Sequence, residues 1–256
     1  MLLFCLQNTS GSIETGFYGL AYSIAAMCFL FTAAMTPVIS REFSKSFAEN
    51  DLVEISKLFK RYVPMLYVIA TYFSVFIAFE ADNLLSIFAD ERFENAYFAL
   101  VIFAFYPLHQ TYGQINASLF FASDETVKYR NIGLFCSLVG LIFSYFFIYK
   151  YEYGAAGFAM KMVLIQLLSV NIQLYFNVKF LKLKLSDFMC HQIYSVVIFS
   201  IIAYITKVSM FQNVIYDFIL SGIIYTLVFL VFLFLYPHVF GFKKEDIIYI
   251  KSLVKF

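Results

Sequence analysis

Seven long apolar stretches, separated by short polar segments, fill most of this 256-residue chain. As helices rising about 1.5 Å per residue, they are long enough to cross the roughly 30 Å hydrocarbon core of a bilayer. They lie near residues 16–39, 62–79, 96–121, 131–149, 156–178, 190–208 and 215–236. We therefore expect an all-α, polytopic membrane helix bundle of about seven transmembrane helices, without a soluble domain.

Lysine and arginine fall mainly in every second gap between these stretches. The gaps at 40–61, 122–130 and 179–189, together with the C-terminal tail, hold fourteen of the eighteen basic residues. Because cytoplasmic loops carry an excess of basic residues, this pattern predicts an N-terminus outside and a C-terminus in the cytoplasm. The basic residues form no single patch, so no nucleic-acid partner is expected.

The composition excludes an ordinary soluble domain, because 62% of residues are apolar and only 14% are charged. The four cysteines are scattered singly, without the spacing of a metal site or a disulfide framework. The three histidines lie in separate segments, and no HExxH, CxxC or GxSxG motif is present. We expect neither enzymatic activity nor a cofactor.

The gap at 40–61 is long enough to have structure of its own. Asp51, followed three residues later by Glu54, is typical of a capped helix start. The apolar positions after it predict an amphipathic helix on the cytoplasmic face, either a connector or a partner-binding element. Glu80 and Asp217 lie at the ends of predicted spans, where we expect them to be solvated.

The third predicted span carries the richest polar face. His109, Gln110, Gly113, Gln114 and Asn116 fall within about 160° of the helical wheel. Polar side chains are costly in hydrocarbon, so this face should point into the bundle. It serves either hydrogen bonding between helices or the lining of a cavity.

The fifth predicted span repeats this pattern. Gln166, Ser169, Gln173 and Asn177 lie along one stripe, which predicts another interior face. Lys161 is the only formal charge well inside a span. It could bind an anion, or its flexible stem could carry the ammonium group to the outer interface.

Several segments resemble a known family. One is GFYGLAYSIAAMCFLFTAAMTPVISREFSK, in which Pro37 is followed by Arg41; another is LLSIFADERFENAYFALVIFAFYPLHQTYGQINASLFFASDETVKYRNIG, and a third is YGAAGFAMKMVLIQLLSVNIQ. Over roughly residues 10–180 the sequence resembles the polysaccharide-exporter branch of the multidrug/oligosaccharidyl-lipid/polysaccharide superfamily. That branch contains the O-antigen and lipid-linked oligosaccharide flippases.

The resemblance implies two six-helix lobes facing a central cavity, with two further C-terminal helices in some members. Residues 1–15 contain no basic residue and no complete span, so we expect them to be the external end of a truncated span. Residues 16–180 would form a five-helix portion of the C-terminal lobe, 181–240 the two additional helices, and 241–256 a cytoplasmic tail. The other lobe would be missing, or supplied by a separate chain.

The implied function is to translocate a lipid-linked oligosaccharide, an O-antigen or capsule repeat unit, across the bacterial inner membrane as part of a transporter. Its partners would be that glycolipid and the membrane lipids. The alternatives are a drug/cation antiporter of the same superfamily, a membrane glycan polymerase or acyltransferase, or an inactive fragment. The residues and the resemblance together predict substrate contacts at Arg41, His109, Gln110, Gln114, Asn116, Lys161, Gln166 and Gln173.

Overall fold

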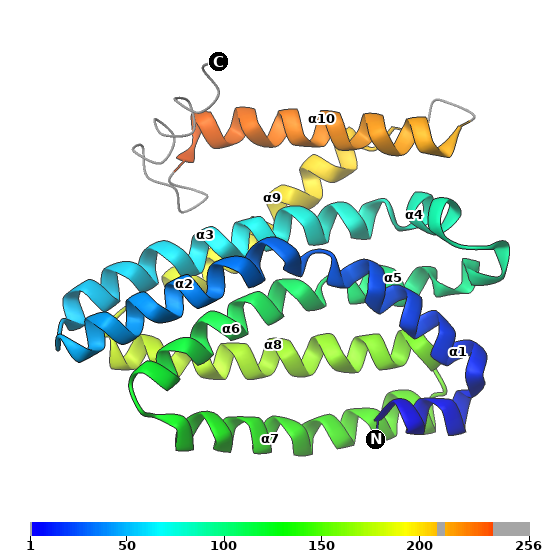
Figure 1. Ribbon diagram of the computed structural model, residues 1–256. Coiled ribbons are helices and arrows are strands. Elements are labelled where there is room, and N and C mark those ends of the chain that lie inside the picture. The colour runs from blue at the N-terminus through cyan, green and yellow to red at the C-terminus, as the bar shows by residue number, and fades with distance from the viewer. Residues whose placement is uncertain (1, 209–212, 238–256) are drawn as a thin grey trace.

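The computed structural model describes residues 2–208 and 213–237, and every regular element in these two ranges is helical (Figure 1). The elements are α1 (Leu2–Ala26), α2 (Phe29–Ala48), α3 (Leu52–Phe79), α4 (Ala81–Phe88), the 3₁₀ helix η1 (Glu91–Ala96), α5 (Tyr97–Phe103), α6 (Tyr106–Ala122), α7 (Thr126–Ser144), the π-helical turn η2 (Tyr145–Lys150), α8 (Gly154–Phe180), α9 (Leu185–Thr206) and α10 (Val214–Leu235). The all-α prediction is confirmed for the described residues, and the predicted tail at 241–256 lies outside them.

Five of these helices are long and apolar enough to cross a membrane: α3, α7 with its continuation η2, α8, α9 and α10. They correspond to the predicted spans that begin near residues 62, 131, 156, 190 and 215. The other two predicted spans, 16–39 and 96–121, are each divided between two helices.

The two divided spans have different local causes. α5 ends at Phe103, and Pro107 follows in the first turn of α6. Proline has no backbone N–H to donate to the carbonyl four residues back, and its ring clashes there, so the helix is interrupted. The break between α1 and α2 lies at Met27 and Cys28, where neither proline nor glycine occurs. The sequence therefore contained no signal for the break between α1 and α2.

The two breaks lie at the same level of the bundle. α1 packs against α5, and α2 packs against α6. Phe29 and Tyr106, which follow the two breaks, form an edge-to-face ring contact with centroids 6.4 Å apart. The paired breaks therefore divide this side of the bundle into two shorter helix pairs.

α3 combines two predicted elements in one helix. Asp51 caps its start as expected, because the Asp51 carboxylate accepts a hydrogen bond from the Glu54 backbone N–H at 2.9 Å. The prediction of a separate amphipathic helix on the membrane surface is wrong. Its apolar residues Ile55 and Phe59 are fully buried in the bundle, where Phe59 contacts the rings of Phe43 and Phe188.

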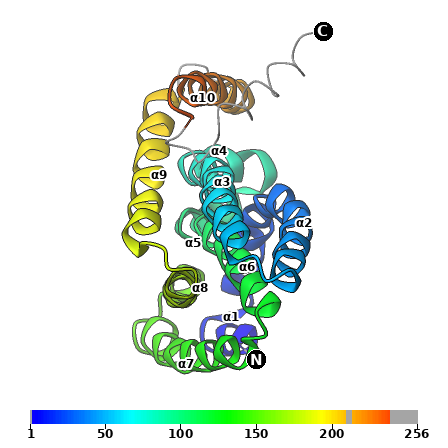
Figure 2. The same ribbon diagram turned by 90° about the vertical axis from the view of Figure 1, so that its left-hand side faces the viewer.

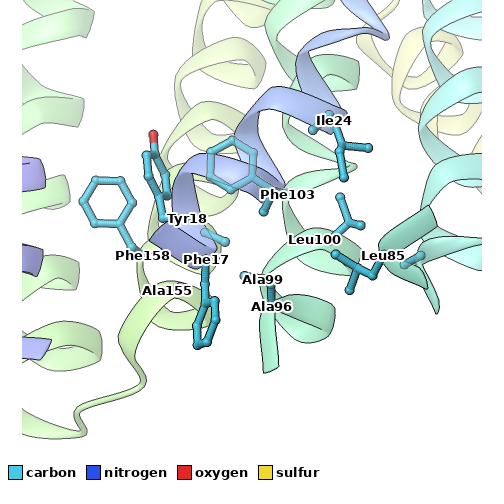
Figure 3. Close-up of a cluster of buried hydrophobic side chains, with 14 of the residues drawn as sticks. Phe17, Tyr18, Ile24, Leu85, Ala96, Ala99, Leu100, Phe103, Ala155 and Phe158 are labelled. Atoms are coloured by element: carbon cyan, nitrogen blue, oxygen red, sulfur yellow. The ribbon is translucent and has the colours of Figure 1, made fainter. Parts of the chain in front are cut away.

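The bundle has a hydrophobic core at each end of α8. Figure 3 shows the first, in which the Tyr18 ring of α1 packs against Phe103 of α5 and Phe158 of α8. The second lies around the other half of α8 and joins α2, α3, α6 and the start of α9. Since each helix of these cores buries one apolar stripe, the polar stripes of α6 and α8 are held in defined directions between them.

In Figure 2, α9 runs along the left-hand side of the other helices, and α10 lies above them. α9 runs along α3, and α10 packs against α4 and α9. A third apolar cluster, which includes Phe199 and Tyr225, joins α10 to α3. There the Tyr225 hydroxyl donates to the Tyr72 carbonyl at 3.0 Å, and the Tyr72 and Thr226 hydroxyls are 2.6 Å apart.

The basic gaps gather at one end of the bundle. In Figure 1 the turns that join α2 to α3 and α6 to α7 lie at the left-hand end. The turn between α8 and α9 lies beside the start of α3, because the Ser56 hydroxyl donates to the Leu181 carbonyl at 3.4 Å. This grouping is what the charge pattern requires of one membrane face, and which face is cytoplasmic stays a prediction.

Candidate functional site

A groove of about 580 Å³ lies between α2, α6, α7 and α8. Polar side chains on its wall come from all four helices: Thr36 from α2, Gln110, Gln114 and Ser118 from α6, Tyr129 from α7, and Gln166, Ser169 and Gln173 from α8. The groove thus brings together the polar stripes of the third and fifth predicted spans.

The close approach of α6 and α8 depends on Gly113. A Cβ atom at this position would lie 3.0 Å from Nε2 of Gln166 and 3.0 Å from Cγ2 of Val170. Val170 is β-branched and fully buried, so it has little freedom to move away. Glycine therefore leaves the space in which the Gln166 amide faces the groove.

Two of the glutamines are held by neighbouring hydroxyls. The Thr36 hydroxyl donates to Oε1 of Gln114 at 3.3 Å. Nε2 of Gln173 donates to the Ser169 hydroxyl oxygen at 3.1 Å, whereas Oε1 of Gln173 has no hydrogen-bond partner. The Gln173 side chain is only 5% exposed. A buried, unpartnered acceptor costs free energy, and a hydrogen-bond donor that reaches this oxygen removes that cost.

Aromatic side chains lie at the α6–α7 end of the groove. Phe121 and Tyr129 both line it, and their rings make an edge-to-face contact with centroids 5.2 Å apart. Phe121 is 57% exposed, so one part of its surface is open to a ligand. From Gln110 to Phe121 the α6 wall of the groove is ~16 Å long at 1.5 Å per residue.

Four of the eight predicted contact residues, the glutamines, line this groove, and the other four do not. His109 lies on another side of α6, in an apolar cleft shared with α5, α8 and α9. Arg41 is exposed on α2, beyond Pro37. His109 and Gln110 differ by about 100° around the helix axis. Because α6 packs on α2, α3 and α8, only the side that carries Gln110 opens onto the groove.

Asn116 and Asn177 join α6 to α8. Asn116 is fully buried, and Nδ2 of Asn177 donates both to its side-chain oxygen at 2.9 Å and to its carbonyl at 3.0 Å. Nδ2 of Asn116 in turn donates to the Tyr112 carbonyl at 2.9 Å. Of the two roles open for this face, Asn116 therefore has the helix–helix role, and Gln110 and Gln114 line the cavity.

Lys161 is buried between α7 and α8. Its side chain is 5% exposed and packs against Gly140 of α7, where a Cβ atom would lie 3.5 Å from Cε of Lys161. The ammonium nitrogen is 3.8 Å from Sδ of Met162 and 5.5 Å from the centroid of the Phe158 ring. The alternative in which the flexible stem carries the ammonium group to the outer interface requires an exposed side chain, and Lys161 is buried. Lys161 is also not on the groove wall.

At the other end of α3, a polar cluster joins the α9–α10 connection to the α3–α4 corner. Lys207 donates to the Phe79 carbonyl at 2.7 Å and to the Asp82 carboxylate at 2.8 Å. Glu80 and Asp217 are only 2% and 7% exposed, so the expectation that both are solvated is wrong. Both carboxyl groups are buried because the helix pair α9–α10 packs over this corner.

Burial raises the pKa of the Glu80 carboxyl above its usual value. Hydrogen bonds from Asn83 and Ser221 and the positive charge of Lys207 act in the opposite direction. The Asn83 amide donates to Oε2 of Glu80 at 2.6 Å. Within the described residues, no group of three or more histidine, cysteine, aspartate or glutamate side chains is arranged to hold a metal ion.

Compared with known proteins, the sequence matches no family model and no curated protein at a significant level.

Sequence reasoning missed Thr36, Ser118 and Tyr129 as groove residues. Thr36 and Tyr129 belong to α2 and α7, whose polar residues form no recognisable interior stripe in the sequence. Only the packing of these helices against α6 and α8 brings them to the same wall. Ser169, by contrast, lies on the stripe that predicted Gln166 and Gln173.

Proposed function

We propose that this chain is part of a membrane transporter that translocates a lipid-linked oligosaccharide across the bacterial inner membrane. The observation that carries the proposal is the groove in which four glutamine amides converge, one of them with an unpartnered buried oxygen. Amides and hydroxyls both donate and accept hydrogen bonds, so they suit a ligand covered with hydroxyl groups. Sugar residues are such a ligand.

The sequence resemblance to the polysaccharide-exporter branch supports the same proposal. In that architecture two lobes face each other across a substrate cavity, and substrate passes by alternating access. The groove is open on one side. We propose that a second lobe covers this side and that the helices before residue 181 form one wall of the cavity.

The test is a deletion of the gene for this chain in its own host. We expect loss of the surface glycan and accumulation of its lipid-linked repeat unit in the cytoplasmic leaflet, with both defects reversed by the intact gene. This experiment works whether or not a separate chain supplies the second lobe. Normal surface glycan in the deletion strain would contradict the proposal.

The proposed direction of transport requires the proposed orientation. The connection at 80–95 should lie outside and the basic turn at 122–130 in the cytoplasm. Cysteines introduced at Asn95 and at Asp124, both exposed, test this with a membrane-impermeant thiol reagent on intact cells whose outer membrane has been permeabilised. Labelling at Asn95 alone is expected, and labelling at Asp124 alone would reverse the orientation.

A further inference from the structure

The groove between α2, α6, α7 and α8 is built from uncharged side chains. Its described hydrogen-bonding groups are amides, the hydroxyls of Thr36, Ser118 and Ser169, and the phenol of Tyr129. Lys161 and Arg41 are not on its wall. An anion entering the groove would therefore lose water without meeting a positive charge, which is costly in a low-dielectric site.

The unpartnered oxygen of Gln173 also favours an uncharged hydroxyl over an anion. Its amide nitrogen donates to the Ser169 hydroxyl, whereas the buried oxygen at the same end of the side chain has no hydrogen-bond partner. A hydroxyl can donate a hydrogen bond to it. An ionised carboxylate or phosphate has only acceptor oxygens, so it leaves Gln173 unsatisfied and places negative charge beside a carbonyl oxygen.

The aromatic end of the groove has the same selectivity. Phe121 and Tyr129 offer ring surface against which the apolar C–H face of a sugar ring can be buried. The negative face of an aromatic ring attracts cations and is unfavourable to a nearby anion.

We infer that this groove takes an uncharged, hydroxyl-bearing sugar portion of the ligand and excludes acidic sugars. The inference rests on the proposed transport function and adds the class of glycan to it. The pyrophosphate of a lipid-linked sugar stays outside the groove, and the neutral sugar residues lie between the glutamines with a ring against Phe121 and Tyr129.

The experiment compares two probes that differ at one carbon. One is a polyprenyl-pyrophosphate-linked neutral oligosaccharide, and the other has a single C6 hydroxymethyl group oxidised to a carboxylate. Binding of each is measured by fluorescence titration with the purified full chain in lipid nanodiscs. Because one lost buried hydrogen bond costs about 1.4 kcal/mol, a factor of about ten, we expect the acidic probe to bind at least about tenfold more weakly.

Two variants of Gln173 assign the effect to this residue. Gln173→Met keeps the length of the side chain and removes its hydrogen bonds, so it should weaken binding of the neutral probe about tenfold. Gln173→Glu keeps an acceptor oxygen, so it should retain the neutral probe and weaken the acidic probe further. Gln192→Met is the matched control, because Gln192 is a buried amide in the cleft on the other side of α6.

The outcomes separate the inference from the function. If both probes bind equally well and Gln173→Met weakens both, the preference for neutral sugars is wrong and the transport proposal stands. If Gln192→Met weakens binding as much as Gln173→Met, the groove is not the site. If neither probe binds and the deletion strain makes normal surface glycan, the proposed function is wrong as well. Melting temperatures of all variants show whether each remains folded.

Discussion

The carboxylate of Glu14 accepts a hydrogen bond from the backbone N–H of Ala155 at 2.6 Å. A side chain from α1 thus caps the first turn of α8, 141 residues further along the chain. The contact is charge-assisted and lies at the positive end of the helix dipole. Gly154 has a φ of 53° and leaves no room for a Cβ beside the Glu14 carboxylate, so this corner requires glycine.

Glu14→Ala should remove this cap and destabilise the α1–α8 corner. A lost helix cap costs about 0.5–2 kcal/mol, and we expect a corresponding fall in the melting temperature of the purified protein. Glu94→Ala, which removes an exposed carboxylate, is the control. Equal melting temperatures for the Glu14 variant and the unmodified chain would show that this contact does not stabilise the fold.

Gly113→Ala should loosen the contact between α6 and α8. The added methyl group meets Gln166 and Val170 at 3.0 Å, and overpacking of this kind costs about 1–3 kcal/mol. The gain in helix propensity, about 1 kcal/mol, offsets only the lower end of that cost. The displaced Gln166 amide should also weaken binding of the neutral oligosaccharide.

Gly133→Ala is the matched control for that substitution, because a Cβ on this α7 glycine would meet nothing within 4 Å. It should raise the melting temperature through helix propensity alone. If the alanine at position 113 is stabilising to the same degree, the close approach of α6 and α8 is not a constraint.

Lys161→Met should stabilise the protein. The lysine is buried among Phe158, Met162 and Gly140, and a charge inside a membrane helix is unfavourable without a counter-charge. Methionine has a similar length, so we expect a gain on the order of 1–3 kcal/mol in thermal or denaturant unfolding. Lys161→Arg, which keeps the charge, should show no gain.

A different outcome would restore the anion-binding role that the sequence suggested for Lys161. If Lys161→Met remains inserted and folded but no longer supports surface glycan in the deletion strain, while Lys161→Arg does, the ammonium group acts on the transported anion.

Stability should depend on pH through Glu80. Its carboxyl pKa is raised in the folded state, so the folded protein holds this proton at pH values where the unfolded chain, with a pKa of about 4.3, has lost it. The free energy of unfolding therefore falls as pH rises from the unfolded pKa through the folded one. Glu80→Gln should remove this component and stabilise the protein at neutral pH.

Melting temperatures across the acidic to neutral range measure this effect, and Glu49→Gln, a change at an exposed carboxylate at the other end of the bundle, is the control. A pH profile for Glu80→Gln that parallels the unmodified chain would exclude Glu80 as the source.

The spans and stripes that the sequence predicted are properties of local sequence. An apolar run long enough to cross a bilayer indicates a helix wherever it lies, and α8 and α9 agree closely with their predicted ranges. The stripe from Gln166 to Gln173 also follows from helical periodicity alone. The break before Pro107 also has a local cause, the proline itself. The sequence contains that proline, but it did not determine that the predicted span would be divided there.

Only the tertiary structure decided which polar residues meet. Gln110 and His109 are neighbours in the sequence. His109 lies in a cleft against α8 and α9, whereas Gln110 faces the groove between α2, α6, α7 and α8. Burial of Glu80 depends on α10, which begins more than a hundred residues later. Helical periodicity sets the direction of a side chain about its own axis, but its partners depend on how neighbouring helices pack, and that is a non-local property of the whole chain.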